Sequence, residues 1–378
     1  TVEHTRDNGL GVTVYFGTRK GSASTSDLSP EALEETVRAA CNIARFTAED
    51  PCAGLAEAEL MAREVLDLDL YHPWEIGADR AIELALECEG AALALDERLV
   101  NSEGASFNAE TGLSVYANSH GFLGGYPSSR YSLSCALIAQ QGEEMQRDYW
   151  YSLSRCGSEL EPPARIGERA ATRALARLGS RRLPTCRAPV IFQAEVAGSL
   201  LRSLISAIRG ASLYRRASFL LDKLGSKIFP DFVRIHENPH LLRGLASSSF
   251  DAEGVATRAR DLVGQGILLG YVLDSYSARK LGLQTTGNAG GVRNLSLDSG
   301  QLDLDGLIRE MDRGLLVTEL MGQGINLVTG DYSRGAAGFW VEQGALQYPV
   351  EEITIAGNLG AMFERLAAVG TDVDRRGG

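Results

Sequence analysis

Residues 328–342 have the sequence Val-Thr-Gly-Asp-Tyr-Ser-Arg-Gly-Ala-Ala-Gly-Phe-Trp-Val-Glu, in which three glycines surround a polar cluster and lead into an apolar run. The apolar run Phe339–Val341 has the composition of a β-strand. Glycine permits a positive φ or a close approach of two backbones, so a polar cluster among glycines is typical of a recognition loop. The alternative is a glycine-rich hairpin between two strands, and the stretch alone is compatible with both. The polar residues of the cluster are Asp331, Tyr332, Ser333 and Arg334.

The part of the chain around this stretch is rich in glycine. Of the 42 glycines, 18 lie between Gly264 and Gly360, where they separate short apolar runs such as Ile267–Leu269 and Leu315–Val317. Short strands with frequent turn residues predict a curved, barrel-like antiparallel sheet. The other elements predicted in this part are a short buried strand at 190–192 and helices at 195–209 and 357–369.

The N-terminal part carries clear helix and strand signals. Alternation over Gly11–Phe16 predicts a strand, and its hairpin partner continues through Lys20. Ser29 and Pro30 form a favourable helix start, with serine as N-cap and proline at the first helical position, and we expect this helix to reach Phe46.

The next segments predict a helix, a sheet and a second helix. The helix covers 79–98 and has Ile82, Leu86 and Leu93 on one face. Several short alternating runs between Thr111 and Ser152 predict an antiparallel meander. A helix at 164–178 follows, and residues 184–189 have the composition of a linker.

These signals predict an α+β protein of two domains. Residues 1–183 form an antiparallel sheet with helices, and residues 187–378 form the glycine-rich, barrel-like antiparallel sheet with helices. A chain of 378 residues with 44% hydrophobic content is long enough for two domains with cores of their own.

Composition narrows the function classes. A net charge of −12 opposes non-specific binding to nucleic acid, because phosphate binding needs a basic surface. No apolar run approaches the length of a membrane span. The six cysteines are scattered and include no Cys-x-x-Cys pair, which predicts reduced, mostly buried thiols. We therefore expect a cytoplasmic protein without nucleic-acid or membrane partners.

One stretch matches a zinc-peptidase signature. The sequence His236-Glu237-Asn238-Pro239-His240 fits His-Glu-x-x-His, a motif in which a helix brings both imidazoles to one metal. Pro239 opposes a helix here, and the preceding residues 232–235 alternate like a strand. We therefore interpret His236, Glu237 and His240 as a surface turn after a strand, not as a metal site.

A series of longer segments in fixed order resembles one family. The segments are 328–342 together with Lys20–Ser24, Asp27–Pro30, Asp50–Gly54, Asn118–Gly121, Tyr214–Arg216, Phe250–Gly254, Ser275–Lys280, Thr286–Gly291, Thr318–Gly324 and Glu352–Asn358. In this order they resemble the PmbA (TldE) branch of the TldD/PmbA family, whose members were once labelled modulators of DNA gyrase. Family members carry several dozen residues before Thr1 and a short segment after Gly378, so we expect a longer chain.

The resemblance also implies where a metal would be held. In the TldD branch, a helix after a strand carries His-Glu-x-x-x-His, which holds zinc and supplies the catalytic glutamate. The corresponding positions here are Arg202, Ser203 and Ala207; none is a good zinc ligand, and Arg202 would repel the ion. The family's remaining ligand, a cysteine, would lie past Gly378. The resemblance thus implies no catalytic residue and no cofactor in this chain, with zinc in a TldD-type partner.

Other reaction classes lack their motifs. The sequence has no P-loop and no Gly-x-Ser-x-Gly elbow. Gly264-Gln-Gly266 and Gly322-Gln-Gly324 begin like a dinucleotide fingerprint but lack the third glycine at the required spacing. We interpret His120, within Asn118–Gly121, as a turn residue.

Two function classes remain. In the first, which the resemblance favours, the chain pairs with a TldD-type homologue as the substrate-handling subunit of a cytosolic zinc metallopeptidase that cleaves unfolded peptides, including microcin precursors and a labile antitoxin. In the second, it is a homodimeric, non-catalytic peptide-binding or regulatory module. In the first class, an extended peptide would add to a sheet edge of this chain. The candidate peptide- or partner-binding residues are Gly287, Asn288, Gly290, Gly291, Asp331, Tyr332, Ser333 and Arg334.

Overall fold

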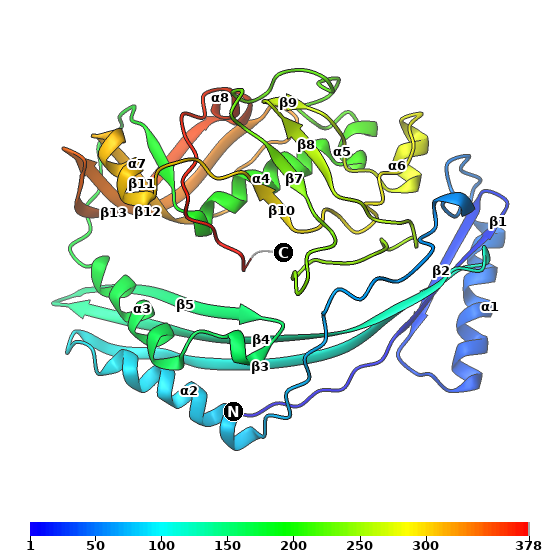
Figure 1. Cartoon of the computed structure of the whole chain (residues 1–378), viewed down its shortest axis with the longest axis horizontal. Helices are drawn as coiled ribbons and strands as arrows, with labels where there is room; N and C mark the ends of the chain where they lie inside the picture. Colours follow the sequence, from blue (N-terminus) through cyan, green and yellow to red (C-terminus); the bar gives the residue numbers. More distant parts are fainter. Residues whose placement is uncertain (377–378) are drawn as a thin grey trace.

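The computed structural model describes residues 1–376, which divide into two layers of secondary structure (Figure 1). The N-terminal half (residues 1–183) supplies a long curved sheet with helices on its outer side. The C-terminal half (residues 187–376) lies over the opposite face of that sheet. The class is α+β, as the sequence predicts.

The hairpin and the first helix form as expected. Strands β1 (Leu10–Phe16) and β2 (Arg19–Thr25) pair antiparallel, and α1 (Pro30–Phe46) packs across them. The Ser29 hydroxyl accepts the Ala32 N–H at 3.4 Å and so caps the helix. A Cβ added at Gly21 of β2 would lie 2.1 Å from the Ala40 carbonyl oxygen, so glycine allows the helix to approach this closely.

The central sheet is an antiparallel meander of β3 (Leu99–Ala117), β4 (Leu123–Gln141) and β5 (Glu144–Ser154). The meander is confirmed, but the expected short strands are wrong, since β3 and β4 each have 19 residues. Pro127 does not interrupt β4. Pro127 lies in the part of β4 that pairs with β3 but not with β5. Because β4 has no second neighbouring strand there, the missing N–H of the proline costs no hydrogen bond between strands.

Helix α2 (Ala78–Leu93) ends earlier than predicted and buries a different face. Ile82 and Leu86 are exposed, Leu86 to 61%, so the predicted face was wrong. The buried face consists of Leu84, Cys88 and Ala92. It packs against α3 (Pro163–Ala176), where a Cβ at Gly167 would lie 2.0 Å from the Cys88 carbonyl oxygen. Small residues face the core because the two helices approach so closely.

The C-terminal half contains two four-stranded sheets and, in its described residues, no closed barrel. The first sheet has the order β13-β12-β11-β6, with β6 (Val190–Phe192) parallel to β11 (Gly314–Met321). The second has the order β10-β7-β8-β9. Its strands are β7 (Ile235–Glu237), β8 (Arg260–Gly264), β9 (Ile267–Leu268) and β10 (Leu295–Leu297).

The glycine-rich stretch is a strand and not a recognition loop. Residues Asp331–Glu342 form β12, which pairs with β11 on one side and with β13 (Ala345–Asn358) on the other. A Cβ at Gly338 would lie 1.8 Å from the Leu316 carbonyl oxygen of β11. The glycine thus permits close packing of neighbouring strands, which sequence composition cannot distinguish from approach to a ligand.

The core of the C-terminal half forms around α4 (Ala194–Ile208). Leu204, Ala207 and Ile208 are buried there against the second sheet and against α8 (Leu359–Glu364), which is shorter than the predicted 357–369 helix. The remaining helices are α5 (Gly210–Tyr214), α6 (Ser275–Lys280) and α7 (Leu304–Met311).

Two further expectations concern the cysteines and the membrane. Each of the six cysteines is free, but only Cys88 and Cys135 are fully buried and Cys186 is exposed. Among residues 1–376, no helix combines the length and the apolar character needed to cross a membrane.

Candidate functional site

Helix α4 presents one polar face to a cleft between the two halves. Glu195, Ser199 and Arg202 recur at helical spacing and line a cavity of about 270 Å³. Ser203 and Ala207 lie on the buried side of the same helix. The other walls come from residues 147–151 of β5, Arg173 and Arg177, residues 318–320 of β11, Arg334 of β12, and Asp374 and Arg376.

Most charges in the cleft are paired. The buried Asp148 carboxylate lies 3.0 Å from Arg173 Nε and 3.6 Å from an Arg177 terminal nitrogen. Arg177 also pairs with Glu319. These ion pairs join α3 and β5 of the N-terminal half to β11 of the C-terminal half, so they fix the width of the cleft.

The C-terminal segment closes one end of the cleft. The Arg376 guanidinium stacks 4.0 Å from the Trp150 ring centroid and donates to the Tyr151 carbonyl at 2.9 Å. It pairs with Asp374 at 2.7 Å and lies 3.8 Å from Glu195. Burial opposes ionisation of Asp374, but the hydrogen bonds from Arg376 outweigh it and lower the pKa of that carboxyl.

The four predicted binding residues of β12 do not lie together in the structure. Arg334 lines the cleft, whereas Asp331 and Ser333 are exposed and Tyr332 is buried in the core beside Leu359. Burial raises the pKa of the Tyr332 phenol. Because successive side chains of a strand point to opposite faces, the four residues cannot act as one cluster.

The second predicted segment, residues 287–291, is a largely buried turn elsewhere in the C-terminal half and does not line the cleft. Asn288 is buried and donates to Glu237, while its own oxygen accepts from Arg260 at 2.7 Å. Gly287, Gly290 and Gly291 all have positive φ, which explains the glycines through turn geometry. Of these three, only Gly290 is exposed.

The residues of the zinc-like motif have other partners. The predicted strand at 232–235 is displaced along the chain: β7 covers Ile235–Glu237, so His236 and Glu237 lie in the strand and not in a turn after it. Glu237 is 2% exposed and so is not on the surface. It pairs with Arg260 at 2.7 Å and accepts the Arg293 N–H at 3.0 Å. His236 Nδ1 lies 3.3 Å from Asp298, and His240 Nε2 lies 3.2 Å from the Thr257 hydroxyl.

These arrangements do not fit zinc. On α4, Arg202 carries a positive charge, Ala207 has no donor atom, and the Ser203 hydroxyl donates to the Ser199 carbonyl at 2.8 Å. In the described part of the chain, no three His, Cys, Asp or Glu side chains gather as a metal site requires.

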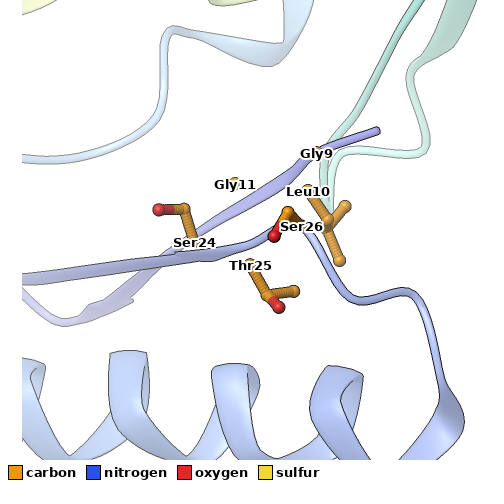
Figure 2. Close-up of a pocket in the computed structure, with 6 residues that line it drawn as sticks. All are labelled: Gly9, Leu10, Gly11, Ser24, Thr25 and Ser26. Atoms are coloured by element: carbon orange, nitrogen blue, oxygen red, sulfur yellow. The ribbon is translucent and has the colours of Figure 1, made fainter. Parts of the chain in front are cut away.

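Two other polar places lie outside the cleft. The hollow beside the β1–β2 hairpin is open and is lined by Gly9, Leu10, Gly11 and residues 24–26 (Figure 2). None of these side chains is charged, so the hollow provides neither an acid–base group nor a charged anchor.

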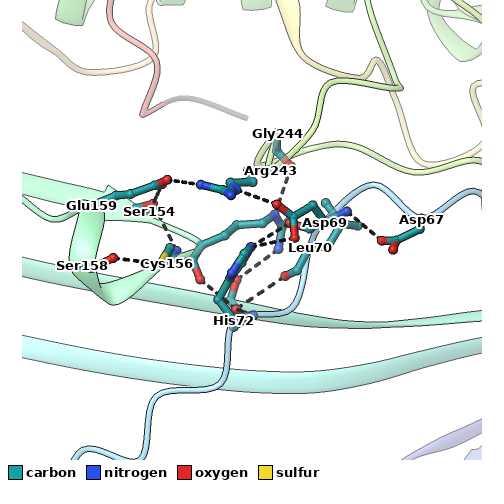
Figure 3. Close-up of polar contacts among 12 residues, drawn as sticks. Asp67, Asp69, Leu70, His72, Ser154, Cys156, Ser158, Glu159, Arg243 and Gly244 are labelled. Carbon is teal, nitrogen blue, oxygen red and sulfur yellow. Dashed lines mark hydrogen bonds and ion pairs between the residues drawn. The ribbon is translucent and has the colours of Figure 1, made fainter.

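The second place is a polar cluster where the halves meet (Figure 3). Arg243 bridges Asp69 at 2.6 Å and Glu159 at 2.5 Å, and its hydrogen bond lowers the pKa of Asp69. His72 Nε2 faces Asp69, while Cys156 Sγ contacts the Ser158 hydroxyl at 3.1 Å. Within the described residues no hydrogen bond joins Cys156 to His72, so the cluster lacks an activated nucleophile.

Sequence reasoning missed several residues of the cleft. Arg173 and Arg177 belong to a run of arginines at every fourth position from Arg165 to Arg181, a signal that was available. Asp374 and Arg376 gave no such signal, because only the fold brings residues near the C-terminus to α4.

Comparison with known proteins identifies the family. The PmbA/TldA metallopeptidase C-terminal domain matches residues 185–378, the central domain matches residues 71–178, and domain 1 matches residues 1–44. The chain belongs to the PmbA/TldA metallopeptidase family. This membership agrees with the resemblance seen in the sequence.

Several relatives of this PmbA/TldA family member are similar over nearly its whole length. Metalloprotease PmbA of Escherichia coli O157:H7 is 54% identical over 99% of this chain and 83% of the relative. A PmbA homologue of Haemophilus influenzae is 52% identical, with the same coverage. A solved structure from Bacteroides thetaiotaomicron, which carries the gyrase-modulator label, has a TM-score of 0.91 at 33% identity, over 96% of this chain and 83% of that one.

More distant family members have names from the TldD and TldE branches. A metalloprotease TldD homologue of Haemophilus influenzae is 22% identical over 96% of this chain and 79% of the relative. The structure of TldE from Thermococcus kodakarensis has a TM-score of 0.80 at 21% identity, over 97% of this chain and 89% of that one. At this identity the TldE structure shows a shared fold only.

Proposed function

We propose that this chain is the metal-free, substrate-handling subunit of a cytosolic zinc metallopeptidase, in which a TldD-type homologue supplies the zinc and the catalytic glutamate. The observation that carries the proposal is the residue content of α4, which presents Arg202 to the cleft and buries Ser203 and Ala207. None of these residues provides a zinc ligand or a general base. The cleft beside α4 is nevertheless lined by charged and polar side chains that a substrate can contact.

The cleft suits an extended, unfolded peptide. Strand β5 lies at the edge of its sheet and lines the cleft over residues 147–151. A strand edge binds peptide through backbone hydrogen bonds and tolerates many side chains. Peptide-antibiotic precursors such as microcin and a labile antitoxin are the substrates that the family resemblance suggests.

The direct test mixes this chain with a zinc-bearing TldD-type homologue and follows hydrolysis of an unstructured peptide. Each chain alone should be inert, whereas the mixture should cleave, and a zinc chelator should stop it. Size-exclusion chromatography of the same mixture should show a complex containing both chains. The proposal fails if this chain alone cleaves in the presence of chelator. It also fails if the mixture stays inactive while this chain forms a stable homodimer, which would support the non-catalytic binding module.

A further inference from the structure

The cleft beside α4 contains hydrogen-bonding groups that the described chain leaves unsatisfied. Within residues 1–376, eight buried side-chain nitrogen or oxygen atoms lack a hydrogen-bond partner. Three of them belong to residues that line this one cleft: Glu195 Oε2, Ser199 Oγ and Arg334 Nε. Ser199 as a whole is 8% exposed. Buried polar groups are nearly always paired with protein, water or a ligand, so unpaired ones around one cavity mark a place where a ligand or ordered water binds.

The cleft carries more positively than negatively charged side chains, so it favours a negatively charged ligand. Six arginines and four carboxylates line it, in a protein whose net charge is −12. Each of the four carboxylates has an arginine within ion-pair distance, and Arg147 pairs with Glu103 outside the cleft. Among the residues that the structure describes, Arg202 and Arg334 have no carboxylate partner. Arg334 donates only to the Leu320 carbonyl, at 3.4 Å, so both guanidinium groups keep a positive charge that can attract a negatively charged ligand.

The donors and the acceptor specify the ligand chemistry. The Arg202 and Arg334 guanidinium groups and the Ser199 hydroxyl are all suited to an oxyanion, and guanidinium binds a planar carboxylate through two parallel hydrogen bonds. Glu195 Oε2 needs a hydrogen-bond donor. A phosphate near neutral pH can offer an O–H, but it would bring roughly two negative charges next to four carboxylates. A peptide carries several N–H groups beside a carboxylate of single charge, so it fits both the acceptor and the donors.

We propose that Arg202, Arg334 and Ser199 bind a carboxylate carried by a peptide, and that Glu195 accepts an N–H from the same peptide. This binding mode rests on the proposed peptide-handling role of the cleft, but it needs neither zinc nor a partner chain, so its failure and the failure of the subunit role are distinguishable.

The test is isothermal titration calorimetry of the purified full chain with unstructured eight-residue peptides. Four versions of one sequence differ only in a free or amidated C-terminus and in an internal Asp or Asn. Removing the carboxylate that the site uses should weaken binding about tenfold, because charge-assisted hydrogen bonds are the stronger class. A loss on amidation identifies the terminal carboxylate as the group bound, and a loss on Asp→Asn identifies the side chain.

Variants of the chain connect the binding to the cleft. Arg202→Gln and Arg334→Gln should each weaken binding about tenfold, and lysine at the same positions should restore part of it. Ser199→Ala should weaken binding without lowering the melting temperature, because its hydroxyl has no partner to lose. Arg63→Gln is the matched control, since Arg63 is exposed and lies outside the cleft.

Three results would overturn the proposal. The four peptides could bind with equal affinity. The glutamine variants could bind like the unchanged protein. Inorganic phosphate could bind with the same dependence on Arg202 and Arg334 while no peptide carboxylate does, which would assign the cleft to phosphate.

Discussion

The carboxylate of Glu237 depends on Arg260 for its charge balance. Both side chains are buried or nearly so, and they meet at 2.7 Å beside the Asn288 amide. A buried charge that loses its partner is strongly destabilising, because neither water nor another cation replaces the interaction. Glu237 stands in the middle of the zinc-like motif, and its contacts in the fold are structural.

Arg260→Ala should therefore lower the free energy of unfolding by about 3–5 kcal/mol. Arg234→Ala is the matched control: Arg234 pairs with Asp261 at 2.8 Å, but its side chain is 49% exposed. Exposed ion pairs contribute at most about 1 kcal/mol. Urea unfolding of the two variants measures the difference. Equal losses would show that burial does not set the strength of the Glu237–Arg260 pair.

The histidines of the same motif give a second prediction. The purified chain should carry no stoichiometric zinc. His236 contacts Asp298 and His240 contacts Thr257. In addition, Pro239 prevents the helix that would bring the two imidazoles to one metal. Elemental analysis after dialysis measures the zinc content. About one zinc per chain, lost in His236→Ala or His240→Ala, would contradict this prediction.

Among the strands of the C-terminal half, Gly338 sets how closely β12 packs against β11. A methyl group there would overlap the Leu316 carbonyl oxygen, so Gly338→Ala must push the two strands apart. The expected loss is about 3 kcal/mol, the upper end of the usual range for overpacking. Gly112→Ala in β3 is the control, because nothing lies within 4 Å of its Cβ position. A similar melting temperature for both variants would mean that β11 can shift without cost.

The turn built on Asp251 gives a pH-dependent prediction. Burial raises the pKa of Asp251 to about 6, against the backbone N–H groups of Ala289, Glu253 and Val255 that donate to it. A carboxyl with a raised folded-state pKa contributes stability below its unfolded pKa, near 3.8, and loses that contribution as pH rises through the folded value.

Between about pH 4 and pH 6, the folded chain should therefore become less stable as Asp251 ionises. Asp251→Asn cannot titrate, so its melting temperature should change less over this interval, although the variant is less stable throughout. Melting temperatures of both proteins across the interval test this. Parallel curves would mean that the pKa of Asp251 is not raised.

The elements also show what sequence can predict. Ser29 and Pro30 act through their own backbone geometry, so the helix start was predicted correctly, whereas the strand before Pro239 lies at 235–237 and not at 232–235. The buried face of α2 was not predicted correctly, because the close packing against Gly167 selects small residues and leaves Ile82 exposed. Likewise, Arg334 and Arg376 line the same cleft only because tertiary packing brings β12 and the C-terminal segment together there.

In the whole molecule, Arg155 makes a deeply buried polar contact between the two halves. Its guanidinium is buried and donates to the carbonyl groups of Gly244 at 3.0 Å, Leu245 at 2.7 Å and Ser129 at 3.2 Å. Two of these acceptors belong to the C-terminal half and one to the central sheet. Truncating Arg155 leaves the carbonyl groups without their donor, a loss of about 1–3 kcal/mol for a buried acceptor.

Arg155→Ala should therefore uncouple the unfolding of the two halves. In a Trp150→Phe, Trp340→Phe background, Trp74, which packs against Phe107 and Tyr131 of the central sheet, reports on the N-terminal half, while far-UV circular dichroism reports on the whole chain. With Arg155 present, both signals should change at the same urea concentration; in Arg155→Ala they should separate. Arg243→Ala is the control, because Arg243 also bridges the halves but is 47% exposed and should leave the transitions together. Coincident transitions in Arg155→Ala would show that the apolar and ionic contacts between the halves keep their unfolding coupled without the hydrogen bonds of Arg155.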